Sequence, residues 1–279
     1  DYITIEGFDI SNDIKNDWHG FGISCGQAHL ETARTGCRIL NNFIHDMEGT
    51  AVFSGKNALV KDNLMRNITR GVFANSGTLV KNNEVDTLVP VMEEKNGELK
   101  PKKTQYNFFC GDDIIFRGNY LHGAPEEYLI KGMGVCFFAS WDDWIFGPSH
   151  RILIENNRGF NATHASEPTA DKLKQSSHIT YRGNLFVNTV FVGIFPREWS
   201  HITVENNTLI NCGAYPVWFT RKRQAEHSVV RNNLIVSIDR ERVVEKYGWK
   251  KPMDGIVSPT YKDPTATLKL CDNNMMWGY

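Results

Sequence analysis

Apolar and polar positions along this chain repeat one short pattern. An apolar residue, any residue and a second apolar residue precede two polar or small residues, an asparagine, any residue and a final apolar residue. The pattern occurs in residues 39–44, 59–64, 79–85, 114–121, 152–160, 179–186, 202–209 and 228–235, weakly in 268–275, and in 3–10 with Phe8 in the asparagine slot. Self-similarity of this kind is the signature of a repeat architecture.

The recurring asparagines mark the rungs of a solenoid. Successive members are 20 to 40 residues apart, and they are Asn42, Asn63, Asn83, Asn119, Asn157, Asn184, Asn207, Asn233 and Asn273. A shortest period near 20 is too small for a helical-pair repeat, and the flanking β-branched residues alternate as in short strands. Asparagine tolerates left-handed backbone at a sharp turn, and stacked amides can bond from rung to rung. Hairpin turns are the alternative, but recurrence in one apolar frame favours the solenoid.

The predicted fold is all-β, a single-stranded right-handed parallel β-helix of about ten rungs with inserted loops. We expect residues 1–279 to form a single domain. The chain starts inside a rung at Tyr2 and stops at Trp277-Gly278-Tyr279 without an evident cap, whereas solenoids normally protect both ends. Two interpretations stay open: the chain is a fragment that lacks its end caps, or its copies associate end to end as a structural or adhesive solenoid.

Composition narrows the class of protein. Apolar residues make up 41% and charged residues 23% of the chain, which argues against disorder. The formal charge is −1, so no global field attracts nucleic acid or an anionic membrane, and no apolar run approaches the roughly 18 residues of a membrane span. The six cysteines form no CxxC pair, which argues against a zinc site. We therefore expect neither a nucleic acid nor a membrane as partner.

Each asparagine motif supplies two strands, so a third strand lies between motifs. The candidates are residues 21–26, 51–55, 71–76, 106–111, 134–140, 193–199, 216–223 and 254–258. Side chains alternate between the two sides of a strand. If the inward residues are Val52, Val72, Phe108, Ile194 and Val217, the next residue of each strand points outward, and these are Phe53, Phe73, Phe109, Phe195 and Trp218. This aromatic stripe either packs rung on rung or is a stacking platform for sugar rings.

Charged residues collect in the loops that leave these third strands. They lie in residues 112–113, 141–144, 197–199 and 221–223. Equivalent loops of a stacked solenoid lie about one strand spacing apart, so residues distant in sequence converge. We expect a groove that mixes carboxylates, cations and tryptophan.

These rung and strand motifs resemble the pectate-lyase-like superfamily of right-handed β-helix proteins, many of them secreted bacterial enzymes that act on acidic polysaccharides. Similar proteins carry a polar stretch like HVDCFQ where this chain has residues 133–138, and a stretch like DYxRFFG where it has residues 105–111. The polar residues of both stretches are missing here. The resemblance implies an extracellular or periplasmic location. The missing polar residues leave three interpretations of the groove: it works differently from the grooves of similar proteins, it is inactive, or it has been rebuilt to hold an apolar ligand.

The loops hold candidates for two kinds of chemistry. β-Elimination on a uronic acid needs a cation for the carboxylate and a base for the α-proton, and Lys131, Arg197 and Arg221 are candidate cations, with Lys131 also a candidate base. Hydrolysis needs two carboxylates, for which Asp112, Asp113, Asp142, Asp143 and Glu198 qualify by type. Paired aspartates also suit calcium, so the sequence fixes no cofactor and leaves calcium as the candidate. His19, His122 and His164 are further candidate acids or bases.

The leading hypothesis is a carbohydrate-active protein that binds an acidic polysaccharide along the third-strand groove, with lyase chemistry ahead of hydrolysis. Its candidate catalytic residues are Asp113, Lys131, Asp142, Arg197 and Glu198. Its candidate substrate-binding residues are Phe53, Phe73, Asn75, Asn107, Phe109, Phe138, Trp141, Phe195, Trp218 and Arg221. The alternative from another class is a non-catalytic or redesigned scaffold that binds an apolar small molecule in the same groove.

Overall fold

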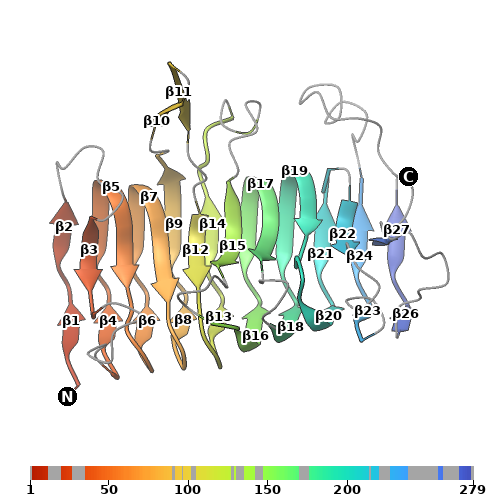
Figure 1. Cartoon of the computed structure of the whole chain (residues 1–279), viewed down its shortest axis with the longest axis horizontal. Coiled ribbons are helices and arrows are strands. Elements are labelled where there is room, and N and C mark those ends of the chain that lie inside the picture. Colours follow the sequence, from red (N-terminus) through yellow and green to blue (C-terminus); the bar gives the residue numbers. More distant parts are fainter. Residues whose placement is uncertain are drawn as a thin grey trace.

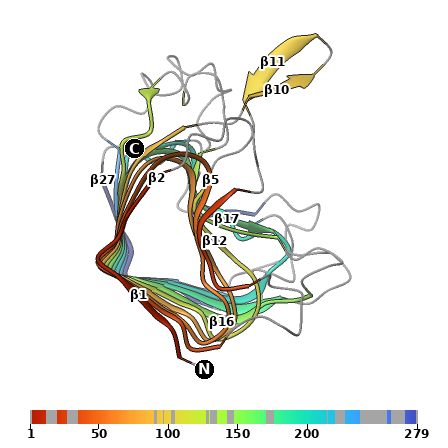
Figure 2. The same cartoon turned by 90° about the vertical axis from the view of Figure 1, so that its left-hand side faces the viewer.

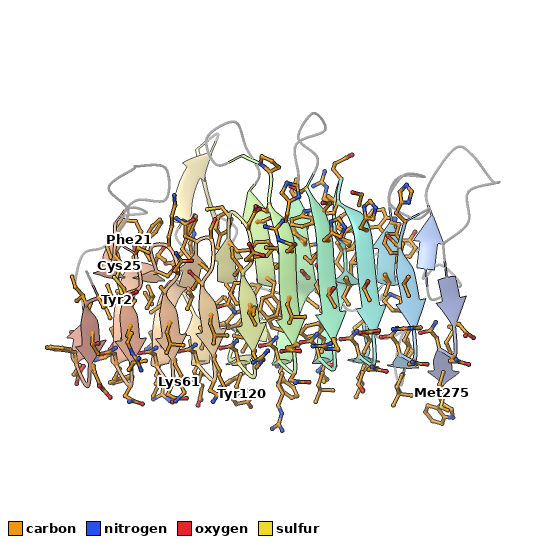
Figure 3. The ribbon with its side chains drawn as sticks, turned by 90° about the horizontal axis from the view of Figure 1, so that it is seen from below. Tyr2, Phe21, Cys25, Lys61, Tyr120 and Met275 are labelled. Atoms are coloured by element: carbon orange, nitrogen blue, oxygen red, sulfur yellow. The ribbon has the colours of Figure 1, made fainter. Side chains whose placement is uncertain are left out.

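Strands stack one above another along a single long axis in the computed structural model (Figure 1). The structure describes residues 2–11, 20–26, 35–89, 92–95, 97–101, 105–126, 129, 135–141, 147–169, 176–213, 215–219, 227–237, 257–259 and 270–277. Tyr2 and Met275 lie at opposite ends of this axis (Figure 3).

Two long sheets of parallel strands form the walls of the solenoid. The ten-stranded sheet contains, in spatial order, β1 (Thr4–Glu6), β4 (Arg38–Leu40), β6 (Leu59–Lys61), β8 (Leu79–Lys81), β13 (Ile115–Arg117), β16 (His150–Glu155), β18 (Ser177–Arg182), β20 (Ser200–Glu205), β23 (Val229–Arg231) and β26 (Leu270–Asp272). Each of these strands is the first strand of one rung, so the predicted β-helix of about ten rungs is confirmed.

The fifteen-stranded sheet supplies the other two sides of each rung. Its strands are β2 (Asp9–Ser11), β3 (Phe21–Ser24), β5 (Phe43–Phe53), β7 (Leu64–Ala74), β9 (Glu84–Leu88), β12 (Gln105–Phe109), β14 (Tyr120–His122), β15 (Cys136–Trp141), β17 (Arg158–Thr169), β19 (Leu185–Ile194), β21 (Thr208–Ile210), β22 (Tyr215–Phe219), β24 (Leu234–Val236), β25 (Val257–Pro259) and β27 (Met275–Trp277). Viewed end on, the long strands bend around a corner (Figure 2). The predicted third strand is thus often the second half of one bent strand.

A buried ladder of asparagine side chains runs through the turn between the two sheets. Asn63 Oδ1 accepts both the backbone N–H and the side-chain amide of Asn42, at 3.0 Å each. Asn63 Nδ2 in turn donates to Asn83 Oδ1 at 2.8 Å and to the carbonyl of Ile39 at 3.0 Å. The same bonds link all later members, because each rung places its asparagine directly above the previous one.

The two ends of the ladder test the assignments made from sequence. Phe8 occupies the first slot as expected, and its backbone N–H donates to Asn42 Oδ1 at 3.0 Å. At the other end the assignment was wrong by one residue: Asn274, not Asn273, accepts from the amide of Asn233 at 2.8 Å. Asn273 instead takes the left-handed turn position before it, with a φ of 50°.

Apolar side chains fill the space that the sheets enclose. Valine and isoleucine from the short strands, such as Ile39, Val60 and Val80, are 0% exposed. Aromatic rings join them in the middle rungs, where Phe116 contacts Phe138 edge to face with ring centroids 5.3 Å apart. A separate antiparallel hairpin, β10 (Met92–Lys95) with β11 (Glu98–Pro101), projects away from the solenoid (Figure 2).

No helix within the described ranges is long and apolar enough to cross a membrane.

Charges alternate along the outer side of the ten-stranded sheet. The aligned positions from β13 to β26 are Arg117, Glu155, Arg182, Glu205, Arg231 and Asp272. Glu155 is 4% exposed and accepts hydrogen bonds from Arg117 and Arg182 on either side. Burial by itself would raise the pKa of Glu155, but the two guanidinium groups outweigh it and hold the pKa below its usual value.

Removing one rung of the amide ladder should destabilise the whole coil. Asn83→Ala removes the side-chain bonds of Asn83 to Asn63 and Asn119 and leaves the carbonyl of Val60 without its amide donor, so we expect a loss of about 2–4 kcal/mol in the free energy of unfolding. Asn82→Gly is the matched control, since Asn82 is exposed and glycine keeps its φ of 54°. Denaturant melts compare the two, and equal losses would contradict a structural role for the ladder.

The charge row should make stability depend on acid. The folded-state pKa of Glu155 lies below its unfolded value of 4.5, so its stabilisation is complete above that pH and is lost as pH falls through the folded value. We expect Glu155→Gln to cost about 2 kcal/mol at pH 7, because half-exposed arginines soften the loss of their buried partner. The free energy of unfolding, measured between pH 7 and pH 3, should fall less steeply in the variant; an unchanged slope would contradict the assignment.

Candidate functional site

The outward side of the third strands, here called the third-strand face, carries two rows of side chains. Register pairs align Thr50, Arg70, Cys136, His164, Val192 and Tyr215 in the first row, and the backbone of Gln105 joins Arg70 to Cys136. The second row, three residues further along each strand, contains Phe53, Phe73, Phe108, Ala139, Glu167, Phe195 and Trp218. Neighbouring members of a row belong to adjacent strands, about 4.8 Å apart.

The predicted aromatic stripe is present but differs at one rung. Phe108, expected to point inward, packs outward against Phe73 with ring centroids 4.7 Å apart. Phe109, expected to point outward, is 0% exposed in the main core and contacts Phe116 and Trp199. The register explains the exchange, because Asn107 lies opposite Val72 and Phe109 opposite Ala74. Phe138 also belongs to the core, so neither Phe109 nor Phe138 faces the groove.

One half of the third-strand face is apolar. Six side chains form a cluster separate from the main core: Phe53, Phe73, Phe108, Cys110, Cys136 and Ala139. The rings of Phe53 and Phe73 stack at 4.6 Å, and every member is at most 9% exposed. This half is therefore shielded from solvent.

Asp113, a predicted catalytic residue, lies away from the other candidates. It occupies the turn before β13 with a φ of 59° and accepts a hydrogen bond from Arg151 Nε at 2.6 Å. This hydrogen bond holds the pKa of the Asp113 carboxyl below its usual value. Glu198 lies in the turn before β20, three strands further along the ten-stranded sheet, so roughly 14 Å separates the two turns. Asp113 thus pairs with an arginine and does not converge with Glu198 or Arg197.

Four other predicted residues lie wholly or partly outside the described residues. Lys131, Asp142 and Arg221 lie wholly outside the described residues. Trp141 ends β15 and pairs through its backbone with Thr169, and its side chain is outside the described part.

Two predicted substrate-binding asparagines are buried. Asn75 is 3% exposed, and its Oδ1 accepts the backbone N–H of Ser76 at 2.7 Å. Asn107 is 1% exposed and lies in register with Val72 and Phe138, both members of the main core. Both side chains are therefore part of the framework, and a contact with substrate stays an untested prediction.

The other half of the third-strand face contains a polar centre of three residues. Glu167 lies between a histidine and an arginine: His164 Nδ1 is 3.8 Å from Oε2, and Arg197 Nη1 is 3.4 Å from Oε1. The side chains of His164 and Glu167 are 8% and 9% exposed, whereas that of Arg197 is 48% exposed. Arg197 was a predicted catalytic residue, His164 was one of three candidate histidines, and Glu167 was missed.

A β-bulge turns His164 outward. The pairing of β17 with β19 shifts register between Ala162 and His164. On the other side, the backbone N–H groups of Thr163 and His164 both donate to the carbonyl of Val135, at 2.8 and 3.1 Å. Bulges of this kind redirect a side chain and recur next to functional sites.

Aromatic rings flank the polar centre. Phe195 and Trp218 stack with centroids 4.2 Å apart, and Tyr215 stacks on Trp218 at 5.1 Å. The guanidinium carbon of Arg197 is 5.6 Å from the centroid of Phe195, and Phe191 meets the ring of His164 edge to face at 5.2 Å. Trp218 is partly exposed, so a flat apolar surface lies beside a cation.

The sequence held a signal for Glu167 in the spacing of the asparagines. Val72 follows Asn63 by nine residues and points inward, and Ser166 follows Asn157 by nine residues. Counting from the anchor therefore places Ser166 inward and Glu167 outward. The residues of this interval are polar, unlike those of the aromatic third strands elsewhere, so the aromatic pattern does not reveal it.

A second arginine belongs to the same face. Arg70, in the first row, lies three strands from His164, and burial lowers its pKa to about 10. Among the residues that the structure describes, no group of three or more histidine, cysteine, aspartate and glutamate side chains is arranged to hold a metal ion.

No family model matches this chain. No curated protein and no solved structure matches it either.

The inward placement of Phe109 can be tested by truncation. Phe109→Ala should cost about 3–5 kcal/mol, because it removes a ring at 0% exposure and leaves a cavity. Trp218→Ala, at the partly exposed end of the third-strand face, should cost about half as much or less. Thermal or denaturant unfolding measures both, and the reverse order would show that the assignment of the two sides is wrong.

Proposed function

We propose that this protein is a polysaccharide lyase that binds an acidic polysaccharide along its third-strand face. The observation that carries the proposal is the position of Arg197 over Phe195, beside the stacked ring of Trp218. A uronic acid presents a carboxylate and an apolar ring face, and these match a guanidinium group and an aromatic surface respectively. A polymer substrate of this kind fits an extracellular or periplasmic location.

The charges of the face favour elimination over hydrolysis. Within the described residues of its two rows, Glu167 is the one carboxylate, whereas glycoside hydrolysis generally uses two. Elimination needs a cation that neutralises the uronate carboxylate and a group that takes the α-proton, and the face offers Arg197 and His164.

The apolar half of the face favours a second candidate function. The cluster around Phe53, Phe73 and Phe108 resembles the wall of a site for an apolar small molecule, as expected for a non-catalytic scaffold. Small-molecule sites combine such walls with a few polar groups, and His164 and Glu167 lie two strands from Phe108.

The test is a panel of uronate polymers assayed for the absorbance of the unsaturated product. We expect a signal with at least one acidic polymer and none with a neutral polysaccharide of similar length. Arg197→Gln should lower kcat/KM about 100-fold, because it removes the charge-assisted bond to the substrate carboxylate. Trp218→Ala should raise KM about tenfold through loss of stacking.

If the wild-type protein is folded by circular dichroism but forms no unsaturated product from any polymer of the panel, the lyase proposal is wrong. Binding of an apolar fluorescent dye that Phe73→Asp abolishes would then favour the scaffold.

A further inference from the structure

We propose that His164 is the catalytic base of this site and that Glu167 is its positioning residue. The proposal rests on the lyase function above and assigns the proton transfer to a pair that lies within one strand, β17. Arg197, from the turn after β19, contacts the substrate carboxylate.

The surroundings of the pair make its charges effective. Cys136 and Val192 flank His164 in the first row, at 3% and 0% exposure. Ala139 and Phe195 flank Glu167 in the second row, at 6% and 5% exposure. Electrostatic interactions strengthen where water is excluded, so a carboxylate 3.8 Å from the imidazole stabilises the positive charge that the ring gains when it takes a proton.

Glu167 lies between the base and the cation, which suits a positioning residue and not a nucleophile. One oxygen faces the imidazole of His164, and the other faces the guanidinium of Arg197. Its side chain is 9% exposed, while Arg197 is 48% exposed and can be reached by a polymer. Glu167 therefore fixes the relative position of base and cation and acts through both.

The reaction follows from this arrangement. Arg197 pairs with the uronate carboxylate and acidifies the proton on C5. His164 takes that proton, a double bond forms between C4 and C5, and the C4–O4 bond breaks with its electron pair leaving on O4. The imidazolium then returns its proton to O4, which restores neutral His164 and releases a new chain end with a hydroxyl group. Glu167 stabilises the transient imidazolium.

Rates measured against pH on the full chain test these roles. With a 4-linked polyuronate, His164→Gln should lower kcat by about 10²-fold to 10⁴-fold. Glu167→Gln should lower kcat about tenfold and move the acidic limb of the kcat/KM profile about one unit to lower pH, because the imidazolium loses its carboxylate. Glu167→Asp should restore part of the rate. Glu205→Gln, the same change on the ten-stranded sheet, should stay within twofold of wild type.

The outcomes distinguish the proposals. Lyase activity that survives His164→Gln, or a pH profile that Glu167→Gln leaves in place, would overturn the roles assigned here while the lyase stands. Imidazole NMR of His164 gives a readout that needs no turnover: a short 4-linked oligouronate should shift its signals in wild type and not in Arg197→Gln. Binding of the oligomer without that shift would overturn the assignment of His164.

Discussion

The buried chain of asparagine amides is the constraint on which the rest of this solenoid depends. Each Oδ1 accepts from the rung before it and each Nδ2 donates to the rung after it, for example from Asn42 through Asn63 to Asn83. Because the amides from Asn42 to Asn233 are at most 2% exposed, a slip by one residue would leave several polar groups without partners. The ladder thereby fixes the register of every strand that leaves the turn.

Register, once fixed, determines which side chains meet on the outer faces. Glu167 and Arg197 are 30 residues apart in sequence, yet they pair because β17 and β19 are adjacent in the sheet, and His164 lies beside Glu167 on β17. The bulge before His164 adds a local adjustment that the ladder alone does not provide. Long insertions between rungs leave these relations intact, since each new rung resumes its place at the next asparagine.

The third-strand face changes character along the axis. Buried, stacked phenylalanines line the face at the earlier rungs, whereas the later rungs combine a histidine, a carboxylate and an arginine with partly exposed Trp218. The apolar neighbours of the polar centre exclude water from His164 and Glu167, which strengthens the electrostatic interactions among its charges. The outer side of the ten-stranded sheet is different again, with alternating charges that neutralise one another around Glu155.

The sequence by itself determined the architecture, because the asparagine spacing and the apolar frame are local, periodic signals that survive inserted loops. It also identified Arg197 as a candidate and gave the outward direction of Phe53, Phe73 and Trp218. Tertiary structure decided the rest. Strict alternation placed Phe108 inward, but register with β7 buries Asn107 and Phe109 instead, since pairing across strands overrides local hydrophobicity. The pairing of Asp113 with Arg151, and the meeting of His164, Glu167 and Arg197, depend on which rungs are neighbours, and only the folded coil brings those rungs together.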